Sequence, residues 1–208
     1  MDYQLYVIDS DYVDYLRADQ RLRNVFDNEE KTGRYGRKYI GILLVINGVD
    51  FYAPFSSPKP TDYLQGAIRH SVLPIIRMGG KGLNGDQVLL GTIKLSNMIP
   101  GPKEVCHLLN ISLINDPFYQ SLLWKELSFV KANKAMISKN AAIIYSEKTR
   151  QNQYLAQGEG KSLTFNLVLI FFTRLKKASD IKNKSQGGFT PPWLDSFFIR
   201  LQSFRLRQ

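Results

Sequence analysis

Two segments of strand character separated by Asn47-Gly48 constrain the fold more than any other feature. Tyr39–Ile46 is largely apolar, and Val49–Phe55 follows directly after the two turn residues. Asn-Gly strongly favours a two-residue turn between antiparallel strands. The sequence therefore predicts a β-hairpin. Its geometry places the Arg37 end of the first strand beside the Ser56 end of the second.

The segment that leaves this hairpin carries hydroxyls and a cation on a stiff backbone. Ser56, Ser57 and Lys59 follow the second strand closely, and prolines flank the lysine. Each proline ring fixes its own φ and restricts the residue before it. No acid occurs near the lysine until Asp62. The pattern predicts a small rigid anion site; the alternative is a proline-rich surface loop that binds nothing.

The distribution of charge favours a polyanionic partner. The net charge is +10, but residues 1–30 carry eight acids and three bases (−5), so residues 31–208 carry ten acids and twenty-five bases (+15). A basic domain with exposed aromatic residues is typical of nucleic-acid binding. In Arg34–Lys38, Arg37 suits a phosphate and Tyr35 suits base stacking. The alternative is a solvated charged turn on a basic protein with no nucleic-acid role.

Other segments predict a mixed fold. A helix begins at Asp116-Pro117, because a capping acid followed by proline favours helix initiation. Lysines of this helix, Lys131 among them, either line a nucleic-acid groove or form a solvated face. Val105–Ile111 fits a strand or a helix equally well. The remaining predictions are strands at Tyr3–Ile8, Val72–Arg77 (an edge strand) and Gln87–Leu95, helices at Asp11–Arg23 and Lys139–Gln157, and a short helix at Thr61–Arg69.

Missing motifs narrow the chemistry. HExxH, Cys/His clusters and recognisable carboxylate pairs are lacking, and His70 and His107 stand alone in the sequence. We therefore expect no metal or other cofactor. A metal-independent ribonuclease fits, because RNA supplies its own nucleophile, the 2′-hydroxyl. A lone cysteine, no visible signal peptide and apolar runs too short for a bilayer predict a cytoplasmic protein without membrane contact.

Four stretches and one helix resemble the ToxN/AbiQ family of endoribonuclease toxins, from type III toxin–antitoxin and phage abortive infection systems. Ser56-Ser57-Pro58-Lys59, within Tyr52–Lys59, is the most specific of them. The others are Leu5–Ile8 with Tyr12, Arg37–Ile42, Leu90–Lys94 running to Met98–Pro100, and the helix around Tyr119–Asn133. The likeness covers about residues 3–155 and stops before the basic, aromatic C-terminus.

The resemblance implies an α+β fold with an antiparallel, partly closed β-barrel, similar to Kid/MazF toxins, and flanking helices. It implies sequence-selective cleavage of mRNA that leaves a 2′,3′-cyclic phosphate and a 5′-hydroxyl. It also implies inhibition by a small repeated pseudoknot RNA in a closed protein–RNA assembly, with no DNA partner. By position, Ser57, Lys59, Ser56 and Arg37 form the expected catalytic set, and Tyr35, Tyr12, Lys38, Lys94 and Lys131 the expected RNA contacts.

We expect the toxin-like domain to span residues 1–162, and residues 163–208 to form an atypical basic, aromatic segment. Two other functions fit the same residues. A non-catalytic RNA-binding module would use the basic and aromatic side chains without reactive geometry. A structural protein of a mobile element would neither cut nor bind RNA.

Overall fold

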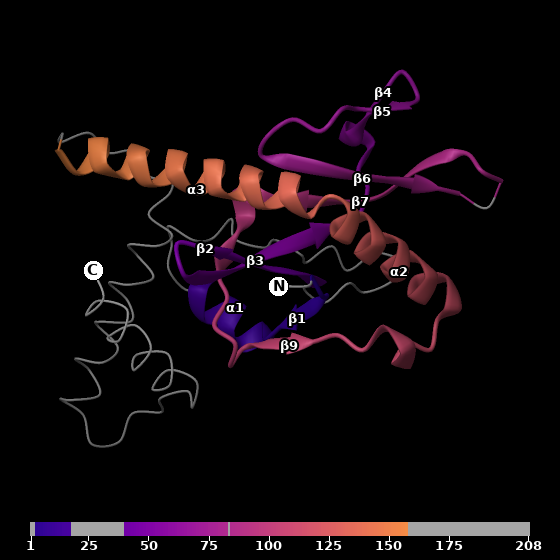
Figure 1. Cartoon of the computed structure of the whole chain (residues 1–208), viewed down its shortest axis with the longest axis horizontal. Coiled ribbons are helices and arrows are strands. Elements are labelled where there is room, and N and C mark those ends of the chain that lie inside the picture. Colours follow the sequence, from indigo (N-terminus) through magenta and orange to yellow (C-terminus); the bar gives the residue numbers. More distant parts are fainter. Residues whose placement is uncertain (1–2, 18–39, 83, 158–208) are drawn as a thin grey trace.

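The fold is a bent antiparallel sheet with two helices packed against it (Figure 1). The computed structural model describes residues 3–17, 40–82 and 84–157. Within them, every strand pairing is antiparallel, and the strand order is β6-β7-β3-β2-β1-β9, with β8 also paired to β3. The strands are β1 (Tyr6–Ile8), β2 (Ile40–Ile46), β3 (Val49–Ser56), β6 (Ile75–Lys81), β7 (Gln87–Lys94), β8 (Ile99–Pro100) and β9 (Cys106–Leu108).

The predicted hairpin is confirmed as β2 and β3. Asn47 and Gly48 both have positive φ, 50° and 75°, as a tight turn between twisted strands requires. Gly41 pairs with Pro54 across the ladder. A Cβ at Gly41 would lie 2.2 Å from the Ala53 carbonyl oxygen, so only glycine fits there. The hairpin thus brings the start of β2 beside the end of β3.

The edge of β3 that faces away from β2 pairs with two different strands in turn, and the sheet bends between them. Tyr52 pairs with Ile99 of β8, whereas Phe55 pairs with Ile93 of β7. Tyr52 and Phe55 are three residues apart in β3, whereas their partners Ile99 and Ile93 are six residues apart. Three residues between these partners are therefore looped out of the pairing with β3. They form the 3₁₀ turn Leu95–Asn97. Pro54 lies opposite this break, where its missing N–H leaves no ladder bond unmade.

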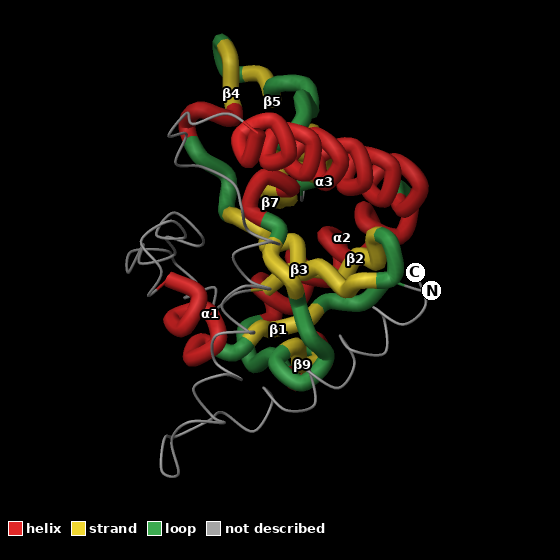
Figure 2. Tube along the Cα trace, turned by 90° about the vertical axis from the view of Figure 1, so that its left-hand side faces the viewer, coloured by secondary structure: helices red, strands yellow, loops and turns green. Residues whose placement is uncertain are grey.

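Two helices close the core. Helix α2 (Pro117–Ala132) begins as predicted, because Oδ1 of Asp116 accepts the N–H groups of Phe118 (2.9 Å) and Tyr119 (3.0 Å). It packs on β6 and β7, and α3 (Lys134–Gln157) packs on β2 and the 3₁₀ turn (Figure 2). Their buried apolar side chains are Leu123, Leu127, Val130, Ile137 and Ala141. Helix α1 (Ser10–Arg17) follows β1.

Several predictions need correction. The segment predicted as a helix over Thr61–Arg69 is a 3₁₀ turn, Pro60–Asp62, followed by the hairpin β4 (Tyr63–Leu64) and β5 (Ala67–Ile68). The second long helix begins at Lys134 instead of Lys139. Among the described strands, β6 and β9 end the sheet without pairing to each other, so the predicted partly closed barrel is not found.

Other predictions are confirmed or untested. Val105–Ile111 contains a strand, β9, and β6 lies at an edge of the described sheet. The second part of the helix predicted over Asp11–Arg23, and everything expected of residues 163–208, lie outside the described residues. No described helix is long and apolar enough to cross a bilayer.

Candidate functional site

The serine and lysine residues singled out from the sequence lie where β3 ends. Ser56, the last residue of β3, is half-buried and pairs with Thr92 of β7. Thr92 in turn pairs with Arg77 of β6, so these three residues form one row across three strands. Ser57 is exposed and Lys59 half-buried. An exposed hydroxyl residue and a half-buried lysine therefore follow each other within two positions, directly after β3 ends.

The backbone of Lys59 is fixed by Asp62. The Lys59 N–H donates to Oδ2 of Asp62 (2.9 Å), and the Asp62 N–H donates to the Lys59 carbonyl oxygen (2.9 Å). This reciprocal pair of bonds caps the 3₁₀ turn Pro60–Asp62. The flanking prolines add their own restriction, because their φ angles are set. The loop is held by specific bonds as well as by its composition.

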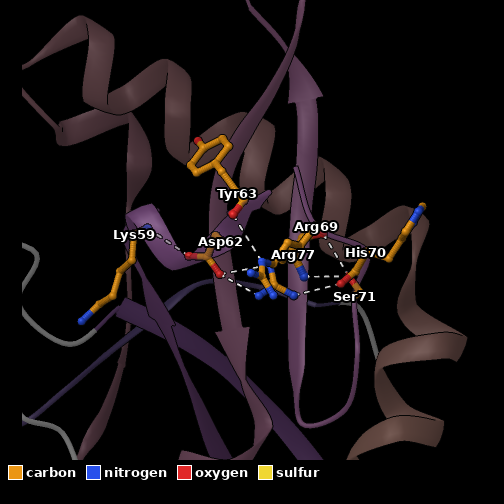
Figure 3. Close-up of polar contacts among 7 residues, drawn as sticks. All are labelled: Lys59, Asp62, Tyr63, Arg69, His70, Ser71 and Arg77. Carbon is orange, nitrogen blue, oxygen red and sulfur yellow. Dashed lines mark hydrogen bonds and ion pairs between the residues drawn. The ribbon is translucent and has the colours of Figure 1, made fainter. Parts of the chain in front are cut away.

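Asp62 also forms a buried ion pair with Arg77. Nε and Nη2 of Arg77 both lie 3.0 Å from Oδ1 of Asp62, and the two side chains are 10% and 8% exposed. Nη1 of Arg77 donates to the His70 carbonyl oxygen (2.9 Å). The Asp62 carboxylate therefore neutralises Arg77, and the Lys59 ammonium group extends away from it (Figure 3). Sequence reasoning missed this pair, although Asp62 was visible as the nearest acid.

The structure assigns different places to the other predicted residues. Arg37, Tyr35 and Lys38 lie outside the described residues. Lys94 is half-buried at the end of β7, and Lys131 is exposed in the last turn of α2. Of the predicted catalytic set, Ser56, Ser57 and Lys59 lie within the described residues, and they are neighbours along the chain.

Tyr12 was expected to contact RNA, but it is fully buried. Its hydroxyl donates to the Pro100 carbonyl oxygen (2.7 Å), which ties α1 to β8. A side chain with no exposed surface cannot stack on a base. Tyr12 is therefore a packing residue and not an RNA contact in this structure.

The sequence suggests that His107 is isolated, but the structure gives it a partner. Its Nε2 lies 2.9 Å from Oδ1 of Asp9, and both side chains are well exposed. Within residues 3–17, 40–82 and 84–157, no three histidine, cysteine or acidic residues lie close enough together to hold a metal ion. In the same residues, no carboxylate or imidazole bonds to the Ser57 hydroxyl.

Three buried groups in the described part of the chain have shifted pKa values, and burial raises the pKa of Tyr52 well above its usual range. Burial raises the pKa of the Cys106 thiol to about 12, with smaller contributions from Asp50, Asp9 and Glu104. The thiol is thus protonated at neutral pH and is no nucleophile. Burial lowers the pKa of Lys148 to about 8, and its Nζ donates to the Ser96 carbonyl oxygen. Lys148 therefore links α3 to the 3₁₀ turn opposite Pro54.

Comparison with known proteins supplies a family. The chain matches the family described as toxin ToxN, type III toxin–antitoxin system, over residues 4–168. The endoribonuclease ToxN of Pectobacterium atrosepticum is 31% identical over 136 residues, which cover 65% of this chain and 75% of that protein. The endoribonuclease ToxN of Bacillus thuringiensis subsp. kurstaki is 27% identical over 153 residues, 72% of this chain and 71% of that protein.

Solved structures agree in fold. A structure of a bacterial antiviral system regulated by a processed non-coding RNA aligns with a TM-score of 0.53 and 27% identity, over 80% of this chain and 93% of that one. AbiQ, a lactococcal anti-phage endoribonuclease of a type III toxin–antitoxin system, aligns with a TM-score of 0.55 over 89% of this chain and 100% of that one. At 14% identity, the second likeness concerns the fold alone.

Proposed function

Because the chain belongs to the ToxN family of type III toxin–antitoxin toxins, we propose that it is an endoribonuclease that works without a metal ion. The 2′-hydroxyl of the RNA attacks the adjacent phosphate, which leaves a 2′,3′-cyclic phosphate and a 5′-hydroxyl. One observation carries the proposal: exposed Ser57 lies two residues before cationic Lys59, whose backbone is fixed by buried Asp62.

The chemistry requires alignment of the 2′-hydroxyl and stabilisation of charge on the pentavalent phosphate. Lys59 and Arg37 supply positive charge to the phosphate oxygens. Ser57 aligns the 2′-hydroxyl, and Ser56 supports it at the end of the strand. A serine hydroxyl is too weak a base to remove the proton unaided, so its contribution is orientation.

We further propose that a small repeated RNA, folded as a pseudoknot, inhibits the enzyme by occupying this site within a closed protein–RNA assembly in the cytoplasm. The +15 charge of residues 31–208 supports an RNA partner, because phosphate contacts provide most of the affinity of basic proteins for RNA. Lys38, Tyr35, Lys94 and Lys131 are the proposed further contacts. The substrate is mRNA, cut at selected sequences.

The test is to incubate the purified protein with total RNA in EDTA and to map new 5′-hydroxyl ends. The proposal expects such ends with wild type and none with Lys59→Ala, while both proteins give the same circular dichroism spectrum. If the RNA stays intact but binds tightly and is released at high salt, the protein is a non-catalytic RNA-binding module and not an enzyme. If the protein neither cleaves nor binds RNA, both functions are contradicted.

A further inference from the structure

Resting on the proposed function, we propose that residues 60–74, here called the arm, form a second RNA-binding surface. The arm contains the hairpin β4–β5, and it follows directly after Lys59. On this proposal it grips the substrate strand a few nucleotides from the phosphate that is cut. Tyr63 supplies a ring for stacking, and Arg69 supplies a cation for a phosphate.

The arm is exposed to a degree unusual for its composition. Its hairpin β4–β5 projects from the body in both views, and in Figure 1 it lies beyond β6 (Figure 1 and Figure 2). Tyr63 is 36%, Leu64 58% and Val72 68% exposed, and Leu73 is 38% exposed. Exposed apolar side chains concentrated in one segment mark a contact surface more often than isolated ones do. Because its apolar side chains cover little of the core, the arm serves something other than packing.

The arm is nevertheless firmly held. The Arg69 N–H donates to the Asp62 carbonyl oxygen (2.9 Å), and Arg77 binds the arm through the His70 carbonyl oxygen (2.9 Å) and the Ser71 hydroxyl (2.8 Å). The ion pair that fixes Lys59 therefore also fixes the arm (Figure 3). A surface already held in place loses little conformational entropy when it binds.

Charge identifies RNA as the partner. Residues 57–82 contain four basic residues, Lys59, Arg69, Arg77 and Lys81, and one acid, Asp62. That acid is buried and neutralised by Arg77, so the exposed charge of this segment is positive. Nε of Arg69 donates to the Tyr63 carbonyl oxygen (3.3 Å), and no carboxylate in the described part of the chain pairs with its terminal nitrogens. They can take a phosphate as a planar fork.

Distance makes the two surfaces continuous. Tyr63 is four residues beyond Lys59, which limits their Cα separation to about 14 Å even for an extended chain. The turn Pro60–Asp62 shortens it further. An RNA strand with its reacting phosphate at Lys59 therefore reaches the arm within a few nucleotides. Base stacking on the Tyr63 ring would hold that strand whatever its sequence, because stacking needs no hydrogen bonds to the base edges.

The experiment compares the double variant Tyr63→Ala/Arg69→Ala with Phe118→Ala/Lys103→Ala. The control removes an exposed aromatic ring and an exposed cation from outside the arm, at the start of α2 and in the turn after β8. Binding is measured in a Lys59→Ala background by anisotropy of a labelled single-stranded RNA. This RNA spans a mapped cleavage site, or has mixed sequence if wild type cuts nothing. The same two double variants are also made without the Lys59→Ala substitution, and their KM and kcat are measured.

The proposal expects the arm variant to raise Kd and KM about tenfold, at unchanged kcat, and the control to change neither. One lost phosphate contact lowers the slope of log Kd against log salt by about 0.7. Melting temperatures should stay at the wild-type value, since all four side chains are exposed. Unchanged Kd and slope in the arm variant would overturn the proposal. So would reduced toxicity in cells at unchanged RNA affinity, which would assign the arm to a protein partner.

If the wild-type protein cuts no RNA, the proposed endoribonuclease activity is contradicted. The binding measurement still tests whether the arm binds RNA. If the wild type cuts RNA and the arm variant binds RNA normally, the proposed enzyme stands and the proposed role of the arm is contradicted. The two failures are therefore distinguishable.

Discussion

Asp62 and Arg77 are fifteen residues apart in sequence, yet their side chains meet at 3.0 Å beneath the Lys59 loop. Asp62 holds the Lys59 N–H with its other carboxylate oxygen. The pair joins the start of the arm to β6. Disturbing the pair should change stability and catalysis together.

Asp62→Asn should lower the free energy of unfolding by about 3–5 kcal/mol, because Arg77 is left buried without its counter-charge. Urea unfolding measures this change. Glu147→Gln is the matched control: it breaks the Arg150–Glu147 pair, whose side chains are 62% and 50% exposed, and should cost at most about 0.5 kcal/mol. Equal losses in the two variants would mean that the buried pair has no special role.

Lys59→Ala should lower kcat by about two to three orders of magnitude, by analogy with deletion of a single donor from an oxyanion hole. The fold should remain intact, because Lys59 lies in a loop and fills no core. Cleavage of a labelled RNA and growth after induction are the measurements, with Lys103→Ala as the exposed-lysine control. Full growth arrest by Lys59→Ala would remove Lys59 from the mechanism.

Ser57→Ala should lower cleavage in the same assay while RNA affinity changes little, since the hydroxyl aligns the nucleophile and carries no charge. Its exposed position means that the melting temperature should not move. Wild-type cleavage by this variant would reduce Ser57 to a turn residue.

Local chemistry explains which parts of the fold the sequence predicts. Asn47-Gly48 and Asp116-Pro117 act through their own backbone preferences, and both the turn and the helix start are confirmed. Within the arm, the sequence predicts a short helix over Thr61–Arg69, and this prediction is wrong. Gln65-Gly66 instead forms a hairpin turn with φ of 50° and 81°. Gly66 was the missed signal, since such a φ is tolerated best by glycine.

Tertiary contacts explain the parts that the sequence does not predict. Strand β6 runs through Gly79 and Gly80, which local preference disfavours in a strand. A Cβ at Gly80 would lie 2.8 Å from Leu90 Cδ1, so glycine is needed to admit that side chain. Likewise, Arg77 meets Asp62 only because pairing with β7 sets the register of β6. Neither fact is visible before the strands are paired.

Gly91→Ala should destabilise the protein by about 1–3 kcal/mol, as expected for overpacking of a filled interior. The added Cβ would lie 2.7 Å from Oε1 of buried Glu126 and 3.0 Å from the Ser56 carbonyl oxygen. Cleavage should also fall, because the strain acts on the end of β3. Gly79→Ala, whose Cβ would meet only Gln87 Nε2 at 3.7 Å, is the control for thermal unfolding. Equal stability of the two variants would contradict the predicted clash.

Lys148 gives a prediction for pH. Burial lowers its folded-state pKa from 10.5 to about 8, so between these values the unfolded chain binds more protons than the folded one. The Lys148 contribution to the free energy of unfolding therefore rises as pH rises through this window. Cys106 acts oppositely, because its raised pKa makes stability fall above pH 9. The difference between wild type and Lys148→Met isolates the lysine, and a difference independent of pH would contradict its burial.

Arg37 should serve both substrate and inhibitor, because an RNA that lies in the active site uses the groups that hold substrate. Each neutralised phosphate lowers log K by about 0.7 per decade of salt for single strands, so about six contacts lose two to three decades over a fourfold rise in salt. Arg37→Ala should weaken cleavage and also flatten this slope for the inhibitor. Lys103→Ala, an exposed cation outside the site, should leave the slope unchanged. The dissociation constant of the inhibitor RNA at several salt concentrations measures both. An unchanged slope in Arg37→Ala would place this residue outside the RNA path, and a salt-independent wild-type affinity would argue for a protein inhibitor instead.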